Sequence, residues 1–158
     1  NVRWTSPVTT GLPSDILRCP TMTRQKGSNI NVYRYGQASW GDDTSVYNTD
    51  MKNKFGQFWL RFSAFSKYIS LKKMKSHSQL VGFGDSGYLI TSSYFGNGYN
   101  RVHAAKVESD RGFQLRHGDR LNALFYDFHV KSLTQNELRN LSAPISYTIS
   151  ANGVGKTL

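Results

Sequence analysis

The sequence feature that most constrains the fold lies near the C-terminus, in residues 116–133. A basic turn over residues 116–120 leads into an apolar run over residues 121–126 that is rich in aromatic and branched side chains. Because this run is too short for a typical helix, it predicts a buried strand. Residues 127–128 then interrupt the pattern before a second strand. We therefore expect a β-hairpin with Asp127-Phe128 as its two-residue loop.

The spacing of polar residues in this stretch resembles a known signature. His117 and Asp127 are separated by nine residues, and Asp127 is followed by Phe128 and His129. The C-terminal signature of bacterial prepilin-like proteins related to the type II pseudopilins is similar: a His, nine residues, Asp-Gly and usually His-Val. Phe128 stands where that family has glycine. The resemblance makes His117, Asn122, Asp127 and His129 the structural signature of this chain.

Other stretches are similar to elements of the same family. Leu17–Pro20 resembles its Leu-x-Cys-Pro element, and Tyr33–Gly36 resembles its Ser-Tyr-Gly-x-Asn element. Residues 69–85 resemble the family's strand that ends in Gly-Asp, here Gly84-Asp85. Together with the signature, these pieces extend over roughly residues 17–133.

The resemblance implies an α+β fold, the pilin-like globular head with an antiparallel β-sheet and short helices. At 158 residues the chain is long enough to bury about two thirds of its unfolded surface as a single domain. We therefore expect one globular domain over residues 1–158, with an extended segment at 1–13 and a flexible tail at 151–158. The long apolar helix that opens mature members of the family is absent from this sequence, and we expect it to precede Asn1.

The function that the resemblance implies is structural and not enzymatic. The chain would be a subunit of a type IV pilus-like or type II secretion pseudopilus-like filament, with other copies or other pilin-like subunits as partners. It would be extracytoplasmic, in the periplasm or at the cell surface, and anchored in the membrane before assembly. Membrane contact would come only through the N-terminal helix, since no run of this sequence has the roughly 18 to 20 apolar residues that a bilayer span needs.

Charge supports a second hypothesis, a basic surface-exposed module that binds DNA or an acidic polymer. Twenty Lys and Arg against ten Asp and Glu give a formal net charge of +10, which favours anionic partners. The lysines that cluster beside Tyr68, and the arginines near the signature turn, are the candidate contacts. These residues are Lys67, Lys72, Lys73, Lys75, Arg116 and Arg120.

The signature residues have three readings from their chemistry alone. A hairpin that brings His117 close to Asp127 and His129 could bind a metal or support acid–base catalysis. In the third reading, Asp127 accepts hydrogen bonds from backbone N–H groups in its turn, and His117 pins the incoming loop to the hairpin.

Three further local patterns give predictions. A polar segment contains three candidate calcium ligands, Asp42, Asp43 and Asp50. We expect either no cofactor or calcium at these residues. Residues 80–83 predict a core strand, and Gly84-Asp85-Ser86-Gly87 predicts a turn in which Asp85 is a turn former. Residues 134–137 have the spacing of a capping box and predict a short helix.

Overall fold

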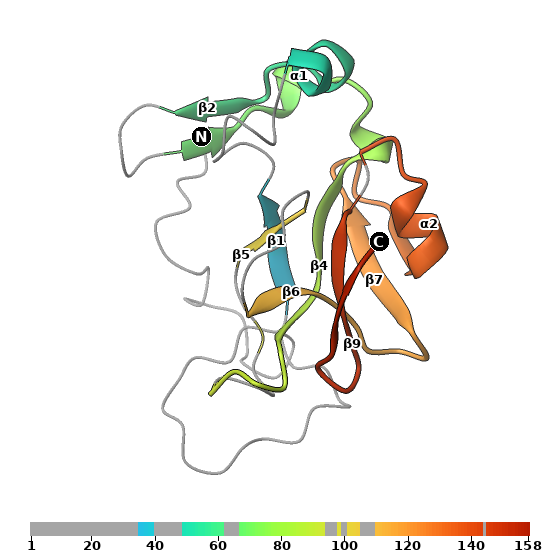
Figure 1. Ribbon diagram of the computed structural model, residues 1–158. Helices are drawn as coiled ribbons and strands as arrows, with labels where there is room; N and C mark the ends of the chain where they lie inside the picture. The colour runs from blue at the N-terminus through green and yellow to red at the C-terminus, as the bar shows by residue number, and fades with distance from the viewer. Residues whose placement is uncertain are drawn as a thin grey trace, which may run out of the picture.

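The computed structural model describes residues 35–39, 49–61, 67–93, 98, 101–104, 110–143 and 145–158. Strands make up most of its regular structure, and the helices are short (Figure 1). The elements in chain order are β1 (Tyr35–Ser39), α1 (Thr49–Phe55), β2 (Trp59–Arg61), β3 (Lys67–Ile69), η1 (Leu71–Lys73), η2 (His77–Gln79), β4 (Val81–Tyr88), β5 (Arg101–His103), β6 (Arg111–Leu115), β7 (Arg120–Phe125), β8 (Val130–Thr134), α2 (Gln135–Arg139), β9 (Tyr147–Ser150) and β10 (Gly155–Thr157).

Eight of these strands form one curled sheet. Its main path runs β10-β9-β6-β4-β1-β5, and β7 branches from β4 to carry β8. The pairs β1–β5 and β6–β9 are parallel, and the other pairs of this sheet are antiparallel. The antiparallel sheet expected from the resemblance is therefore corrected to a mixed sheet in which most pairs are antiparallel. The fold is of the sheet-rich α+β kind, built on a mixed sheet.

Strand β4 is the joint of this sheet. It pairs with β7 through Val81, Phe83 and Gly84, with β1 through residues 83–85, and with β6 through residues 86–88. Its register against β7 shifts between Val81 and Phe83, as at a β-bulge. The expected core strand at residues 80–83 is confirmed as the start of β4.

The turn expected at residues 84–87 is wrong, because these residues continue β4. A Cβ on Gly84 would lie 3.0 Å from the Phe113 ring, and one on Gly87 would lie 2.1 Å from Gln114 Oε1. Glycine in a strand interior marks such close approaches as well as turns. A glycine-rich sequence is typical both of a turn and of a strand that packs closely against its neighbour. In this chain the packing against β6 favours the strand.

The expected hairpin strands are confirmed as β7 and β8, which pair antiparallel from Arg120–Thr134 to Leu124–Val130. Side chains of β7 alternate in burial, with Leu121, Ala123 and Phe125 facing the core. This is the period of a strand with one face inward. The core beneath it also takes in Phe55, Phe58, Phe113, Leu133, Leu138 and Ile145.

Helix α1, the β2–β3 hairpin and the two 3₁₀ turns η1 and η2 form one end of the molecule (Figure 1). Phe55 and Phe58 are fully buried there. The Phe58 ring lies 6.1 Å from that of Tyr126, at the end of the β7–β8 hairpin. This end is therefore packed on the sheet through aromatic contacts.

The C-terminal part of the chain is ordered by pairing and capping. The capping box expected at residues 134–137 is confirmed at the start of α2. Residues 155–157 form β10, which pairs with β9, and the N–H of Leu158 donates to Ser146 O at 2.9 Å. The flexible tail expected at residues 151–158 is thus corrected, because its last residues continue the sheet.

Some expectations fall outside the described residues. These are the extended segment at 1–13, the Leu17–Pro20 element, and the first two residues of the Tyr33–Gly36 element. Its last two residues, Tyr35 and Gly36, open β1.

Candidate functional site

A buried carboxylate in the middle of β4 is the most unusual polar feature of the described chain. Asp85 is fully buried. Its Oδ2 accepts a hydrogen bond from the backbone N–H of Asn122 at 3.1 Å and lies 3.6 Å from Nε2 of His117. The second distance is too long for a hydrogen bond but within ion-pair range. Its Oδ1 is buried and has no hydrogen-bond partner among the described residues.

The protonation of Asp85 reflects opposing effects. Removal from water disfavours the ionised form and raises the pKa of this carboxyl above its ordinary value. The N–H of Asn122 and the neighbouring His117 and Arg116 act in the opposite direction but do not cancel the desolvation. Asp85 therefore holds its proton to higher pH than an exposed aspartate does.

Arg116 extends this site toward β6 and β9. Its Nε donates to Gln114 Oε1 at 2.7 Å, and its Nη2 donates to the backbone carbonyl of Ser86. Gln114 in turn donates through Nε2 to the carbonyls of Ser150 and Ala151 at 3.1 and 3.3 Å. Arg116 is thus committed to internal hydrogen bonds that tie β4, β6 and β9 together.

His117 opens the turn between β6 and β7. Gly118 and Asp119 both have positive φ, of 62° and 58°, and the N–H of His117 donates to the Arg120 carbonyl at 3.4 Å. Two consecutive positive φ values define a type I′ geometry, which suits glycine and aspartate. The His117 side chain is 31% exposed, so it lies between Asp85 and solvent.

Asp127 and His129 form a second, separate pair at the other end of β7. Oδ1 of Asp127 accepts from the backbone N–H of His129 at 3.2 Å and lies 2.5 Å from its Nδ1. Partial desolvation raises the pKa of Asp127, but the hydrogen bonds from the ring and backbone of His129 outweigh it, so the pKa is lowered. The His129 ring stacks on Phe125, with centroids 4.2 Å apart. Both side chains of the pair are partly exposed.

The expected meeting of His117 with Asp127 is therefore wrong. The two residues flank β7, whose six residues at about 3.3 Å each place them roughly 20 Å apart. The partner of His117 is instead Asp85, which sequence reasoning had assigned to a turn. The predicted metal site needs His117 close to Asp127 and His129, and the structure keeps His117 apart from the other two. The described residues contain no group of three His, Cys, Asp or Glu that could hold a metal ion.

The hairpin loop also differs from the expectation. The N–H of Phe128 donates to the Phe125 carbonyl at 3.0 Å, and the N–H of Phe125 donates to the His129 carbonyl at 3.0 Å. The loop therefore has three residues, 126–128, with a positive φ of 69° at Phe128. This is the turn followed by a left-handed residue that glycine usually fills.

The basic residues predicted to contact a polyanion differ in their exposure and in their hydrogen bonds. Lys72, Lys73 and Lys75 are exposed, whereas Arg116 is internal as described above. Arg120 donates to Ser132 and lies 3.4 Å from Glu137. Lys67 begins β3, and its side chain is not described.

Two further lysines, Lys52 and Lys54, were missed by sequence reasoning. They lie exposed in α1, among residues for which the sequence pattern predicted no element. The signal that could have found this helix is the i, i+4 spacing of the half-buried Met51 and the buried Phe55.

The calcium expectation is not tested by the structure. Asp42 and Asp43 lie outside the described residues, and Asp50 lies in α1 without a described side chain.

The chemistry available at the Asp85–His117 pair is limited by access. A carboxylate beside an imidazole can orient the ring or exchange a proton with it. Here the carboxylate is shielded from water and takes part in fixing β4 against the turn that precedes β7. The arrangement is therefore well suited to holding strands in place.

Comparison of the chain with protein-family models, with curated proteins and with solved structures finds no significant match. Within the described part of the chain, no helix has the length and apolar character needed to cross a membrane.

Proposed function

We propose that this chain is the non-enzymatic globular head of a subunit in a pilus-like or pseudopilus-like filament. The sequence support is the set of motifs between residues 17 and 133. A sheet-rich head with short helices is compatible with this role. In the proposal, many copies assemble through an apolar helix upstream of Asn1, and the heads lie outside the membrane.

The observation that carries the proposal is the contact between Asp85 and His117. These residues come from two separate motifs of the resemblance, the strand that ends in Gly-Asp and the His that opens the signature. Their side chains lie 3.6 Å apart in a contact that joins β4 to the β6–β7 turn. Two motifs that are distant in the sequence would thus share one structural task.

The remaining signature residues also support a structural role. Asp127 accepts from the His129 N–H in the hairpin loop, and the N–H of Asn122 is the hydrogen-bond donor to Asp85. The first bond shapes the turn that joins β7 to β8, and the second fixes β7 to β4. A rigid head would present the same surface in every copy, as repeated contacts in a filament require.

The test is assembly of the full-length gene product. The coding sequence with its upstream region is expressed in a bacterium that carries a prepilin peptidase and a pilus assembly system. Sheared surface material is then examined by electron microscopy with antibodies against residues 35–158. We expect filaments labelled along their length. A processed protein that remains dispersed and never enters filaments would contradict the proposal.

A substitution in the head separates assembly from mere processing. His117→Ala removes the partner of buried Asp85, and we expect reduced filament yield with unchanged peptidase cleavage. Lys156→Gln, an exposed change on β10, serves as the control and is expected to leave the yield unchanged.

A further inference from the structure

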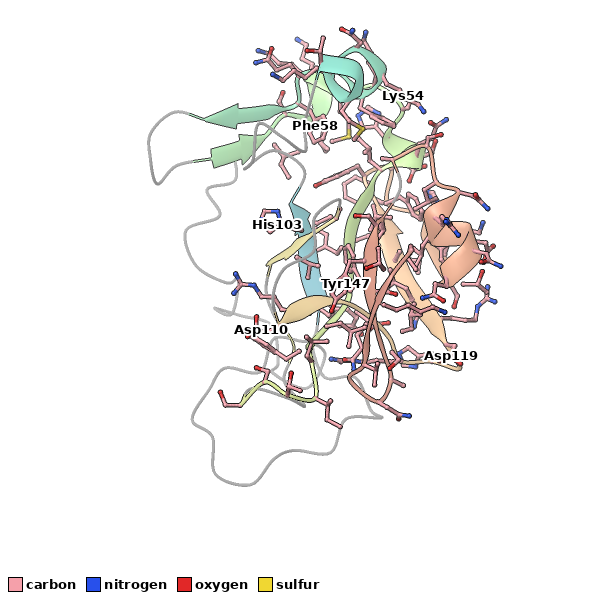
Figure 2. The ribbon with its side chains drawn as sticks, in the orientation of Figure 1. Lys54, Phe58, His103, Asp110, Asp119 and Tyr147 are labelled. Carbon is pink, nitrogen blue, oxygen red and sulfur yellow. The ribbon has the colours of Figure 1, made fainter. Side chains whose placement is uncertain are left out.

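Five exposed lysines gather at the α1 end of the molecule. Lys52 and Lys54 come from α1, Lys72 and Lys73 come from η1, and Lys75 follows it. We call these five residues the lysine cluster. Figure 2 shows Lys54 on α1, at the end of the molecule away from Asp119, with other nitrogen-tipped side chains around it.

The backbone brings the two halves of the cluster together. The N–H of Lys75 donates to the Phe55 carbonyl at 2.7 Å, and the N–H of Ser70 donates to the Phe58 carbonyl at 2.8 Å. Gly56, with φ of 80°, lies so close that a Cβ there would be 2.2 Å from the Lys73 carbonyl oxygen. The end of α1 and the η1 segment are therefore held directly against each other.

Buried apolar side chains make the α1 end of the molecule rigid. Phe55, Phe58 and Met74 lie in the core beneath the lysine cluster. Because the apolar side chains between the lysines point inward, the lysine stems are left on the outer surface. The positions of their backbones are thus set by packing and not by contacts of the ammonium groups.

The charges of the cluster are not neutralised by the described residues. No lysine of the cluster forms an ion pair with a described acidic side chain. Among the described residues, Lys54 and Lys75 donate to the carbonyls of Ser142 and Asn53, and Nζ of Lys54 lies 5.5 Å from the centroid of the Phe55 ring. Elsewhere in the molecule the pattern differs. Lys131 lies 3.4 Å from Glu137, and Lys156 donates to Gln135 Oε1 at 2.8 Å.

We propose that the lysine cluster binds the phosphate backbone of double-stranded DNA without regard to base sequence. Lysine ammonium groups on flexible stems act as point charges toward phosphates. Duplex DNA has a high and regular charge density, which lets several such groups gain from counterion release at once. This proposal does not depend on the filament function.

Among the described residues, the composition of this surface favours a duplex over other polyanions. Unpaired nucleic acid binds through bases stacked on aromatic rings, but Phe55 and Phe58, the aromatic side chains described in these segments, are both buried. Insertion into lipid head groups needs an apolar face. Beside the lysine cluster, Leu71 is 39% exposed and is the exposed large apolar side chain among the described residues of α1 and η1.

The test is a fluorescence anisotropy titration of a labelled 30-base-pair duplex between 50 and 200 mM NaCl. Each lysine that contacts a phosphate contributes about 0.9 to the slope of log K against log salt, which is about eightfold in affinity at 0.1 M salt. We expect Lys72→Gln/Lys73→Gln to lower the slope by about 2 and the affinity by roughly 60-fold.

The control variant is Lys131→Gln/Lys156→Gln, which removes the same charge from β8 and β10, outside the cluster. It should keep the wild-type slope and bind within about twofold of wild type, with thermal unfolding confirming that both variants fold. Equal losses in the two variants would overturn the proposal, because binding would then follow net charge alone. Tighter binding of a 30-nucleotide single strand, or of phosphatidylglycerol vesicles, would also overturn it by assigning the surface to another ligand.

Discussion

At the scale of single residues, Asp85 is the clearest departure from what a strand interior usually contains. A buried carboxylate with one oxygen lacking a partner among the described residues is costly, and its cost grows when the group ionises. The neighbouring His117 and Arg116 reduce this cost without removing it. Asp85 therefore makes the stability of the folded chain depend on pH.

Substitution of Asp85 by Asn is expected to change that dependence. With a raised pKa in the folded state, the stabilising effect of the proton is complete below the unfolded pKa of about 3.8 and is lost as the pH rises through the folded pKa. Wild type should therefore lose stability relative to Asp85→Asn over this range, by at most about 1.4 kcal/mol per pH unit.

The measurement is urea denaturation of both proteins at a series of pH values from 3.5 to 7. The difference between their free energies of unfolding should change with pH and then reach a plateau. A difference that stays constant over the whole series would show that Asp85 ionises as readily in the folded chain as in the unfolded one.

At the scale of elements, the β7–β8 hairpin combines a regular strand pair with a strained loop. Phe128 has a φ of 69° while its side chain is 73% exposed. A left-handed conformation costs roughly 1–2 kcal/mol for a residue with a Cβ, and an exposed ring recovers little of that by burial. The loop is therefore less stable than the strands that it joins.

Phe128→Gly is expected to stabilise the chain by about 1 kcal/mol, because glycine adopts this φ without strain. The matched control is Phe128→Ala, which removes the ring but keeps the Cβ, and we expect it to leave stability within about 0.5 kcal/mol. Urea midpoints at neutral pH give both values. If the alanine variant gained as much as the glycine variant, loss of the ring and not relief of strain would be the cause.

At the scale of the whole molecule, the C-terminal residues complete the sheet. β10 pairs with β9, the N–H of Ile90 donates to the Gly153 carbonyl at 2.8 Å, and Leu158 packs against the core. Gly155 allows this closure, since a Cβ there would lie 1.9 Å from the Tyr147 hydroxyl. The end of the chain thus holds strands from two parts of the sequence.

Removal of residues 152–158 is expected to lower the free energy of unfolding by about 2 to 4 kcal/mol, from lost hydrogen bonds and the exposure of Leu158. Chemical denaturation of the truncated and complete chains measures the change. Val154→Ala is the control, since this side chain is 58% exposed and should contribute little. A truncated chain as stable as the complete one would restore the view of this segment as a flexible tail.

The sequence by itself determined the features that have a local pattern. The buried strand β7, the hairpin that it forms with β8 and the capping box of α2 all follow from residues a few positions apart. The excess of basic residues was likewise clear from composition. For the strand, the hairpin and the capped helix, residues close together in the sequence carry enough information to favour one conformation.

Only the tertiary structure decided what residues 84–87 do and which group faces His117. Gly-Asp-Ser-Gly has the composition of a turn, but β6 packs so close to β4 that a Cβ at Gly84 or Gly87 would meet the side chains of Phe113 or Gln114. Pairing of β4 with β1, β6 and β7 then places Asp85 beside His117 and away from water. Contacts between distant segments depend on strand order and register, for which a single sequence has no local period.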